Sequence, residues 1–357
     1  MKYFIFLLVS FILAACSSKI LRPVPTSTPQ SMPTTLPTIT PKALQFEKPN
    51  FIFQGDDPSV PIITRNPSPK INNLYINPGA VLFHEGKFHM FFNSFTGWPG
   101  VIAVGYAISE DGYHWQMVQD APVFTTDQIP FDNGQADVSV VMVTDDDTWV
   151  MYFHTISEGQ IGRATAASPL GPWLVDADPV LVPGPEGAWD HTWLGWPSIV
   201  KDGDGLRMYY GAKSGGNFAI GMAISTDGAH WTKYNDPTTT DDLYSESDPV
   251  FTPGAKWEYN KLDRPRVVKT PAGWVMLYQA GAAIEQRGLA ISQNGIHWER
   301  YSDNPIFVSD VFPIPNAKTW DTNLLYHEDT FYYFMEIGTL SGTDLYLATQ
   351  QGSLIKP

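Results

Sequence analysis

This sequence has a single cysteine, few basic residues and only one long apolar run. The lone Cys16 leaves no partner for a disulfide within the chain and excludes a zinc site built from cysteines. Lysine and arginine number 22 against 37 acidic residues, and the net charge of −15 argues against nucleic acid and against a basic lipid-binding patch. Phosphate loops, G-x-G-x-x-G, H-E-x-x-H and G-x-S-x-G are also missing, so we expect no cofactor and no metal.

The one long apolar run lies at the N-terminus and leads into the cysteine. Residues 3–13 follow Lys2 and have the length of a signal-peptide core, which is short for a membrane span. The next residues, Leu-Ala-Ala-Cys at 13–16, resemble the lipobox of bacterial lipoproteins. We therefore expect residues 1–15 to be a signal peptide and Cys16 to carry the lipid that anchors the protein to the membrane at the cell surface. The alternative is a short transmembrane anchor with an incidental cysteine.

The next segment, residues 16–44, is too polar and too rich in proline to bury a core. It consists mainly of serine, threonine and proline, which favours an extended polyproline conformation and predicts a semi-rigid stalk. From residue 45 to residue 357 the composition is globular. Glycine, proline and aromatic residues are plentiful there, which favours β-strands over helices.

The globular part contains a repeat. The segments "ISEDGYHW" (108–115), "ISTDGAHW" (224–231) and "ISQNGIHW" (291–298) are similar, and weaker copies occur at 167–173 and 348–352. The markers Ser109, Ser168, Ser225, Ser292 and Thr349 are 59, 57, 67 and 57 residues apart. Two strand-like runs precede each marker, and a Pro-aliphatic segment follows each of the first four. Such units of four strands predict an all-β fold, a five-bladed β-propeller.

The last unit lacks its own Pro-aliphatic strand. The segment "GDDPSVPII" (55–63) has the missing pattern, so we expect it to complete the last blade and close the ring. Within the repeat, aspartate and glycine fit a tight turn and tryptophan fits packing between sheets. The repeated His114, His230 and His297 are spread around the ring, which is a poor arrangement for one metal site.

These repeats, together with "SPLGPW" at 168–173, resemble the β-fructosidase/arabinanase superfamily of five-bladed glycoside hydrolases, family 43 above all. The resemblance covers residues 50 to 355. It implies an active site at one mouth of the central funnel, near the starts of the inner strands. It also implies three acids there: an aspartate base on blade 1, an aspartate on blade 2 that tunes the pKa of its neighbour, and a glutamate acid on blade 3.

Position by position, the match to those acids is partial. Asn77 stands where the resemblance implies the base, and an amide cannot take a proton at neutral pH. Asp137 fits the second acidic position. Trp196 stands near the place of the glutamate acid. The resemblance therefore supports the fold more strongly than the usual mechanism.

Other residues enter the predicted funnel from blades 4 and 5. Blade 4 begins "LDRPRVV" and supplies Asp263, Arg264 and Arg266, while blade 5 supplies Asp321. Asp137 and Asp263 are the carboxylates that we expect to carry catalysis, with Asp190 and Asp321 in reserve. The two arginines either neutralise Asp263 or hold a sugar carboxylate or a phosphate.

Two further candidate residues, Asp190 and His191, precede blade 3. Residues 188–200 align without gaps to 256–268, so Asp190 is the repeat-equivalent of Glu258. A residue required in several blades favours an inter-blade clasp over a catalyst. His191 has no repeat counterpart and is a candidate for ring binding or acid/base chemistry.

Sugar rings have apolar faces that stack on aromatic side chains. Trp98, Trp193 and Trp196 are the aromatic candidates at the funnel mouth, against the alternative that each packs in the core. We expect a monomeric glycoside hydrolase acting on an extracellular oligo- or polysaccharide, with hydrolysis and phosphorolysis, retention and inversion all left open. The rival is a non-catalytic glycan-binding propeller that has lost the acids.

Overall fold

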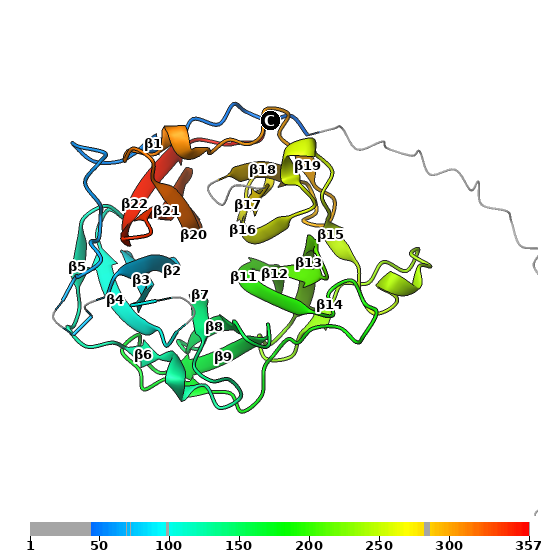
Figure 1. Cartoon of the computed structure of the whole chain (residues 1–357), viewed down its shortest axis with the longest axis horizontal. Helices are drawn as coiled ribbons and strands as arrows, with labels where there is room; N and C mark the ends of the chain where they lie inside the picture. Colours follow the sequence, from blue (N-terminus) through cyan, green and yellow to red (C-terminus); the bar gives the residue numbers. More distant parts are fainter. Residues whose placement is uncertain (1–43, 69, 72, 98–99, 282–285, 357) are drawn as a thin grey trace, which may run out of the picture. The chain divides into compact units, whose positions relative to one another are not determined.

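The computed structural model describes residues 44–68, 70–71, 73–97, 100–281 and 286–356. They form five antiparallel sheets arranged in a ring around a central axis (Figure 1). This is a five-bladed β-propeller, which confirms the fold predicted from the repeats. Cys16, the predicted signal peptide and Trp98 lie outside the described residues. Within the described ranges, no helix is long and apolar enough to cross a membrane.

Each blade starts with a strand beside the axis and proceeds outward. Blade 1 contains β2 (Tyr75–His84), β3 (Lys87–Phe95), β4 (Ala103–Ser109), β5 (Trp115–Met117) and β6 (Phe124–Thr125). Blade 2 contains β7 (Ala136–Val143), β8 (Trp149–Thr155), β9 (Ile161–Ala166) and β10 (Leu174–Val175). Blade 3 contains β11 (Trp193–Asp202), β12 (Gly205–Ser214), β13 (Asn217–Ser225), β14 (Thr232–Lys233) and β15 (Pro249–Phe251). Blade 4 contains β16 (Leu262–Thr270), β17 (Gly273–Ala280), β18 (Arg287–Ser292) and β19 (Glu299–Arg300). Blade 5 contains β20 (Lys318–His327), β21 (Thr330–Thr339), β22 (Gly342–Gln351) and β1 (Ile52–Phe53).

The repeated turn residues hold the turns between the third and fourth strands. In blade 1, Ser109 Oγ accepts a hydrogen bond from the backbone N–H of Gly112 at 2.9 Å, and Asp111 Oδ1 accepts from that of His114 at 2.8 Å. Trp115 donates its indole N–H to the carbonyl of Gly112. Blade 3 repeats these bonds with Ser225, Asp227 and Trp231. The recurring histidines at these turns therefore belong to the scaffold.

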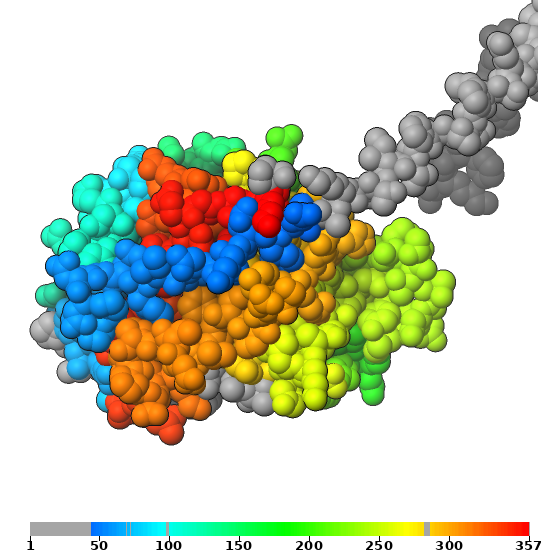
Figure 2. Space-filling model, turned by 90° about the horizontal axis from the view of Figure 1, so that it is seen from above, coloured from blue at the N-terminus to red at the C-terminus, as the bar shows by residue number. Residues whose placement is uncertain are grey.

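The outer strand of a blade is split into two short pieces that both pair with the third strand. In blade 1 these pieces are β5 and β6, and in blade 3 they are β14 and β15. The second piece is the Pro-aliphatic segment of the repeat. In blade 5 both pieces come from the N-terminal segment: β1 pairs with β22, and Ile63 bridges to Leu345. Figure 2 shows this segment lying along the C-terminal strands.

The inner strands carry β-bulges near their starts, and these bulges decide which side chains face the axis. The register shifts between Asn77 and Ala80, between Gly195 and Ser198, between Asp263 and Arg266, and between Thr319 and Thr322. Blade 2 has a shorter shift, between Val138 and Val140. A bulge rotates the residues inside it relative to the regular alternation of a strand. Trp196, Arg264 and Asp321 all lie inside such bulges.

Candidate active site

A cavity of about 330 Å³ opens at the starts of the inner strands, near the lower end of the range for ligand sites. Its lining comes from blades 1, 2, 4 and 5. The lining residues are Tyr75, Asn77, Phe95, Thr96, Gly97, Asp137, Arg264, Trp320, Asp321, Glu336 and Leu340. Three of them are carboxyl groups, which β7, β20 and β21 bring together. This cavity is the candidate active site.

Asp137 begins the inner strand of blade 2 and is 2% exposed. Asn77 donates its amide N–H₂ to both Asp137 oxygens, at 3.3 and 3.4 Å. The amide is fixed in this orientation because Asn77 Oδ1 accepts hydrogen bonds from the Asn93 side chain at 2.8 Å and from the Gly79 backbone at 3.0 Å. Burial and the neighbouring Asp321 carboxylate raise the pKa of Asp137 well above its usual value. Burial and the neighbouring carboxylate therefore both favour the protonated form of Asp137.

Asp321 is the ionised member of the cluster. Arg266 donates from Nη2 to Asp321 Oδ1 at 2.7 Å, and the backbone N–H of Thr322 donates to the same oxygen at 2.7 Å. Burial alone would raise the pKa of Asp321, but the guanidinium groups of Arg266 and Arg264 lower it below its usual value. The carboxylate is therefore available as a base or a nucleophile.

Glu336 lies on β21, the hairpin partner of the strand that carries Asp321, and it is 4% exposed. Its Oε2 accepts the backbone N–H of Asp321 at 3.1 Å. Burial and the Asp321 carboxylate raise the pKa of Glu336 to about 8. Two neighbouring carboxyls with pKa values displaced in opposite directions are the arrangement that acid/base catalysis needs. Sequence reasoning missed Glu336, although a lone glutamate in the apolar run "FYYFMEIG" was a signal for it.

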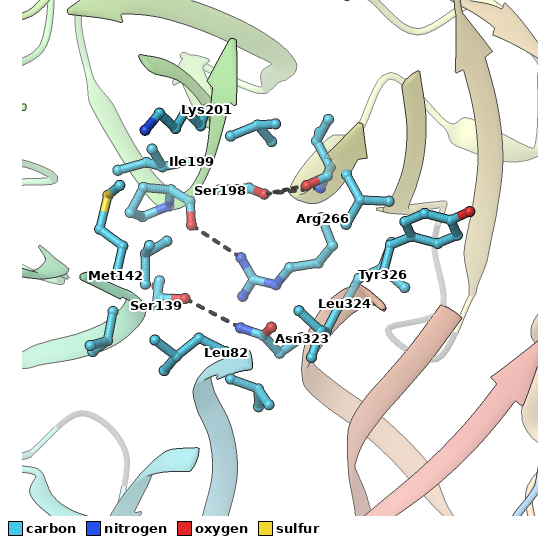
Figure 3. A pocket seen from close by; sticks show the side chains of 18 of the residues that line it. Leu82, Ser139, Met142, Ser198, Ile199, Lys201, Arg266, Asn323, Leu324 and Tyr326 are labelled. Atoms are coloured by element: carbon cyan, nitrogen blue, oxygen red, sulfur yellow. Dashed lines mark hydrogen bonds between the residues drawn. The ribbon is translucent and has the colours of Figure 1, made fainter. Parts of the chain in front are cut away.

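The opposite end of the axis holds a different cavity of about 280 Å³. Its described lining is mainly aliphatic and contains no acidic side chain. Figure 3 shows Arg266 and Asn323 extending across this end from β16 and β20. Asn323 donates to the carbonyls of Gly79 at 2.7 Å and Ser139 at 3.3 Å, and so ties blade 5 to blades 1 and 2. Arg266 lines this cavity while its Nη2 holds Asp321 in the first one.

The two blade 4 residues Asp263 and Arg264 have different positions relative to the cavity. Arg264 lines the cavity, whereas Asp263 is 1% exposed and is not among the lining residues. Arg264 Nη1 lies 3.5 Å from Asp263 Oδ1 and donates to Gln279 at 3.2 Å. The structure therefore places Asp321, and not Asp263, beside Asp137. A catalytic role for Asp263 stays a sequence prediction.

The tryptophans of blade 3 form an aromatic cluster beside the cavity. Trp193 is buried and lies 4.6 Å, centroid to centroid, from Trp196. Both contact the ring of His154, a buried residue whose pKa burial lowers to about 3. The guanidinium carbon of Arg264 lies 4.0 Å above Trp196. Neither tryptophan lines the cavity, so sugar stacking by them stays a prediction, and His154 is a neutral packing residue.

Aromatic residues from blades 1 and 5 line the cavity instead. Tyr75 and Phe95 are stacked with ring centroids 5.5 Å apart, and Trp320 lies beside Asp321. Sequence reasoning missed these three residues. Trp320 occupies the first position inside its bulge, as Trp196 and Arg264 do in theirs, and this equivalence was the available signal. Thr96 and Gly97, the residues before Trp98, also line the cavity.

Asp190 and His191 lie in the loop before β11. Asp190 is fully buried, and its Oδ2 accepts from Lys233 on β14 at 2.6 Å. The equivalent Glu258 accepts from Arg300 on β19 at 2.8 Å. The ion pair thus recurs in blades 3 and 4 as a clasp between the entry loop and the outer strand. Each clasp joins parts of one blade, so the expectation that it links neighbouring blades was wrong. His191 contacts the Ala188 carbonyl and Ser214 at 2.9 and 3.0 Å.

The clasp predicts a stability effect without a catalytic effect. Lys233→Met leaves the Asp190 carboxylate buried without its cation, so we expect the free energy of unfolding to fall by about 3–5 kcal/mol. Activity per folded molecule should be unchanged. Denaturant unfolding and a glycan-release assay would measure the two quantities. Lost activity with an unaltered unfolding curve would instead place Asp190 in the reaction.

Arginine side chains lie beside the carboxyl cluster, and Arg266 is paired with Asp321. Across the described ranges, no group of three or more histidine, cysteine, aspartate and glutamate side chains is arranged to hold a metal ion.

Known structures share this fold. A glycosyl hydrolase from Bacteroides ovatus is 17% identical with a TM-score of 0.63, over 86% of this chain and 96% of that one. A structure from the GH130 family of mannoside phosphorylases, which contains glycoside hydrolases that target β-1,2 mannosidic linkages in Candida mannan, is 17% identical with a TM-score of 0.63, over 90% and 98%. A thermostable family-43 glycoside hydrolase is 17% identical with a TM-score of 0.55, over 80% and 91%. No protein-family model and no curated protein sequence matches this chain. The chain therefore has the propeller fold of glycoside hydrolases.

Proposed function

We propose that this protein is a glycoside hydrolase, anchored by lipid at the cell surface, that cleaves an extracellular oligo- or polysaccharide. One observation carries the proposal: the ionised Asp321 and the protonated Glu336 share one cavity at the funnel mouth. Glycoside cleavage requires one carboxylic acid to protonate the leaving oxygen and one carboxylate to activate water or to attack the sugar. The structural neighbours support a carbohydrate substrate through their fold and their described activities.

Glu336 acts as the general acid and transfers its proton to the glycosidic oxygen as the bond to the anomeric carbon breaks. Asp321 accepts a proton from the attacking water, or attacks the anomeric carbon itself and is later released by water. The anomer formed first distinguishes the two routes: inversion indicates water attack, and retention indicates a glycosyl-enzyme intermediate. Asp137 has a supporting role beside Asp321, whose carboxylate raises the pKa of Asp137.

The rival function is glycan binding without cleavage. Asn77 supports this rival. It occupies the expected position of the base, but its amide donates hydrogen bonds to Asp137 and cannot accept a proton. The two functions differ in their products and not in their ligands.

The test is a screen of the purified protein against plant, fungal and bacterial glycans. The wild type should release sugar from at least one of them, and Asp321→Asn should bind that glycan without releasing sugar. Binding by the wild type without release would establish the lectin function. The lipid anchor is tested separately by mass spectrometry of Cys16 and by a Cys16→Ser variant, which should leave the membrane fraction.

A further inference from the structure

The guanidinium of Arg264 helps to lower the pKa of Asp321, but the proposed hydrolysis does not use its Nε and Nη2 hydrogen-bond donors. This residue lines the cavity, in a chain whose net charge is −15. Both of its polar contacts, with Gln279 and Asp263, are made by Nη1. Among the described residues, Nε and Nη2 have no hydrogen-bond partner, and Nε is buried. A buried donor without a partner costs free energy, which a ligand group can recover.

The β-bulge and a neighbouring aromatic ring hold Arg264 in place. Its φ of 47° lies in the left-handed region, as does the φ of 50° at Trp196 in the equivalent bulge of blade 3, so this conformation belongs to the repeated bulge. The bulge of β16 imposes this conformation, and the ring of Trp196 supports the guanidinium from below at 4.0 Å. A cation held on an aromatic face with one edge unpartnered is suited to a planar anion such as a carboxylate.

We infer that the substrate is an acidic glycan, and that Arg264 binds the carboxylate of a uronic acid unit in the cavity. This inference rests on the proposed function, which it makes more specific. Inorganic phosphate as a co-substrate is the competing source of an anion, and it is an outcome of the test below.

The experiment compares matched ligands by calorimetry. Oligosaccharides containing glucuronic or galacturonic acid are paired with the same oligosaccharides after reduction of their carboxyl groups to neutral alcohols. We expect the wild type to bind at least one acidic form about 10- to 100-fold more tightly than its reduced form. Arg264→Gln should lose this preference and keep the affinity for the reduced form. Arg163→Gln, which removes an arginine paired with Asp176 on blade 2, should behave like the wild type.

Three results would overturn the inference: no acidic ligand is bound, Arg264→Gln keeps the preference, or cleavage requires inorganic phosphate and yields a sugar phosphate. Two further outcomes separate the binding inference from the proposed hydrolysis. If acidic ligands bind through Arg264 but no sugar is released, the binding inference stands and hydrolysis fails. If a neutral glycan is cleaved equally fast by the wild type and Arg264→Gln, hydrolysis stands and the inference fails.

Discussion

Replacing Glu336 by glutamine should lower kcat/KM by about 10²- to 10⁴-fold and at the same time make the protein more stable at pH 7. The loss follows from removal of the general acid. The gain follows from linkage between protonation and folding. Burial raises the pKa of Glu336 to about 8 from an ordinary value of 4.5, so the folded state binds this proton more tightly than the unfolded state.

The difference in the free energy of unfolding between Glu336→Gln and the wild type depends on pH. The Glu336 proton stabilises the fold fully below pH 4.5, and its contribution falls as the pH rises towards 8. Glutamine does not ionise, so Glu336→Gln should match the wild type near pH 4 and exceed it by roughly 3 kcal/mol at pH 7. Denaturant unfolding at the two pH values measures the difference. Equal stability at pH 7, together with full activity, would remove Glu336 from the proposed mechanism.

Replacing Arg266 by methionine should have the opposite effect on stability. Arg266 is 3% exposed and holds the buried Asp321 at 2.7 Å, so its removal leaves a buried carboxylate without its cation. We expect the free energy of unfolding to fall by about 3–5 kcal/mol. The pKa of Asp321 should rise, because Arg266 lowers it more than Arg264 does and only Arg264 remains in this variant.

Two further variants make this result interpretable. Arg163→Met breaks a more exposed pair with Asp176 and should cost at most about 1 kcal/mol. The double variant Arg266→Met/Asp321→Asn should recover most of the lost stability without recovering activity. If the double variant is as unstable as Arg266→Met alone, then packing of the arginine, and not its charge, accounts for the loss.

The fold could be predicted from the sequence because each blade repeats the same turn. Ser109 and Ser225 make equivalent hydrogen bonds, so the spacing of the turns gave the number of blades. The equivalence of Asp190 and Glu258 predicted a shared structural role, and both accept from a cation on an outer strand, but of their own blade and not of a neighbouring one. Asp137 could be selected because the family resemblance marked its position.

The rest of the site depends on features that no repeat encodes. The bulge of β16 puts Arg264 in the cavity and Asp263 in its wall, and the bulge of β20 turns Asp321 towards Asp137. Simple alternation along a strand does not predict such rotations. Glu336 stands out in the sequence as a lone glutamate in an apolar run, but its place beside Asp321 follows only from the pairing of β21 with the strand that carries Asp321.

The pH dependence of kcat/KM tests the carboxyl cluster most directly. With a glycan found in the screen, activity should be highest between two limbs: a fall at acidic pH, below the usual range of an aspartate, as Asp321 takes up a proton, and a fall near pH 8 as Glu336 loses one. On an aryl glycoside of the same sugar, whose leaving group needs no acid, Glu336→Gln should remain active and lose the alkaline limb. Wild-type activity that stays constant through pH 10, or an alkaline limb that persists in Glu336→Gln, would contradict the assignment of acid and base.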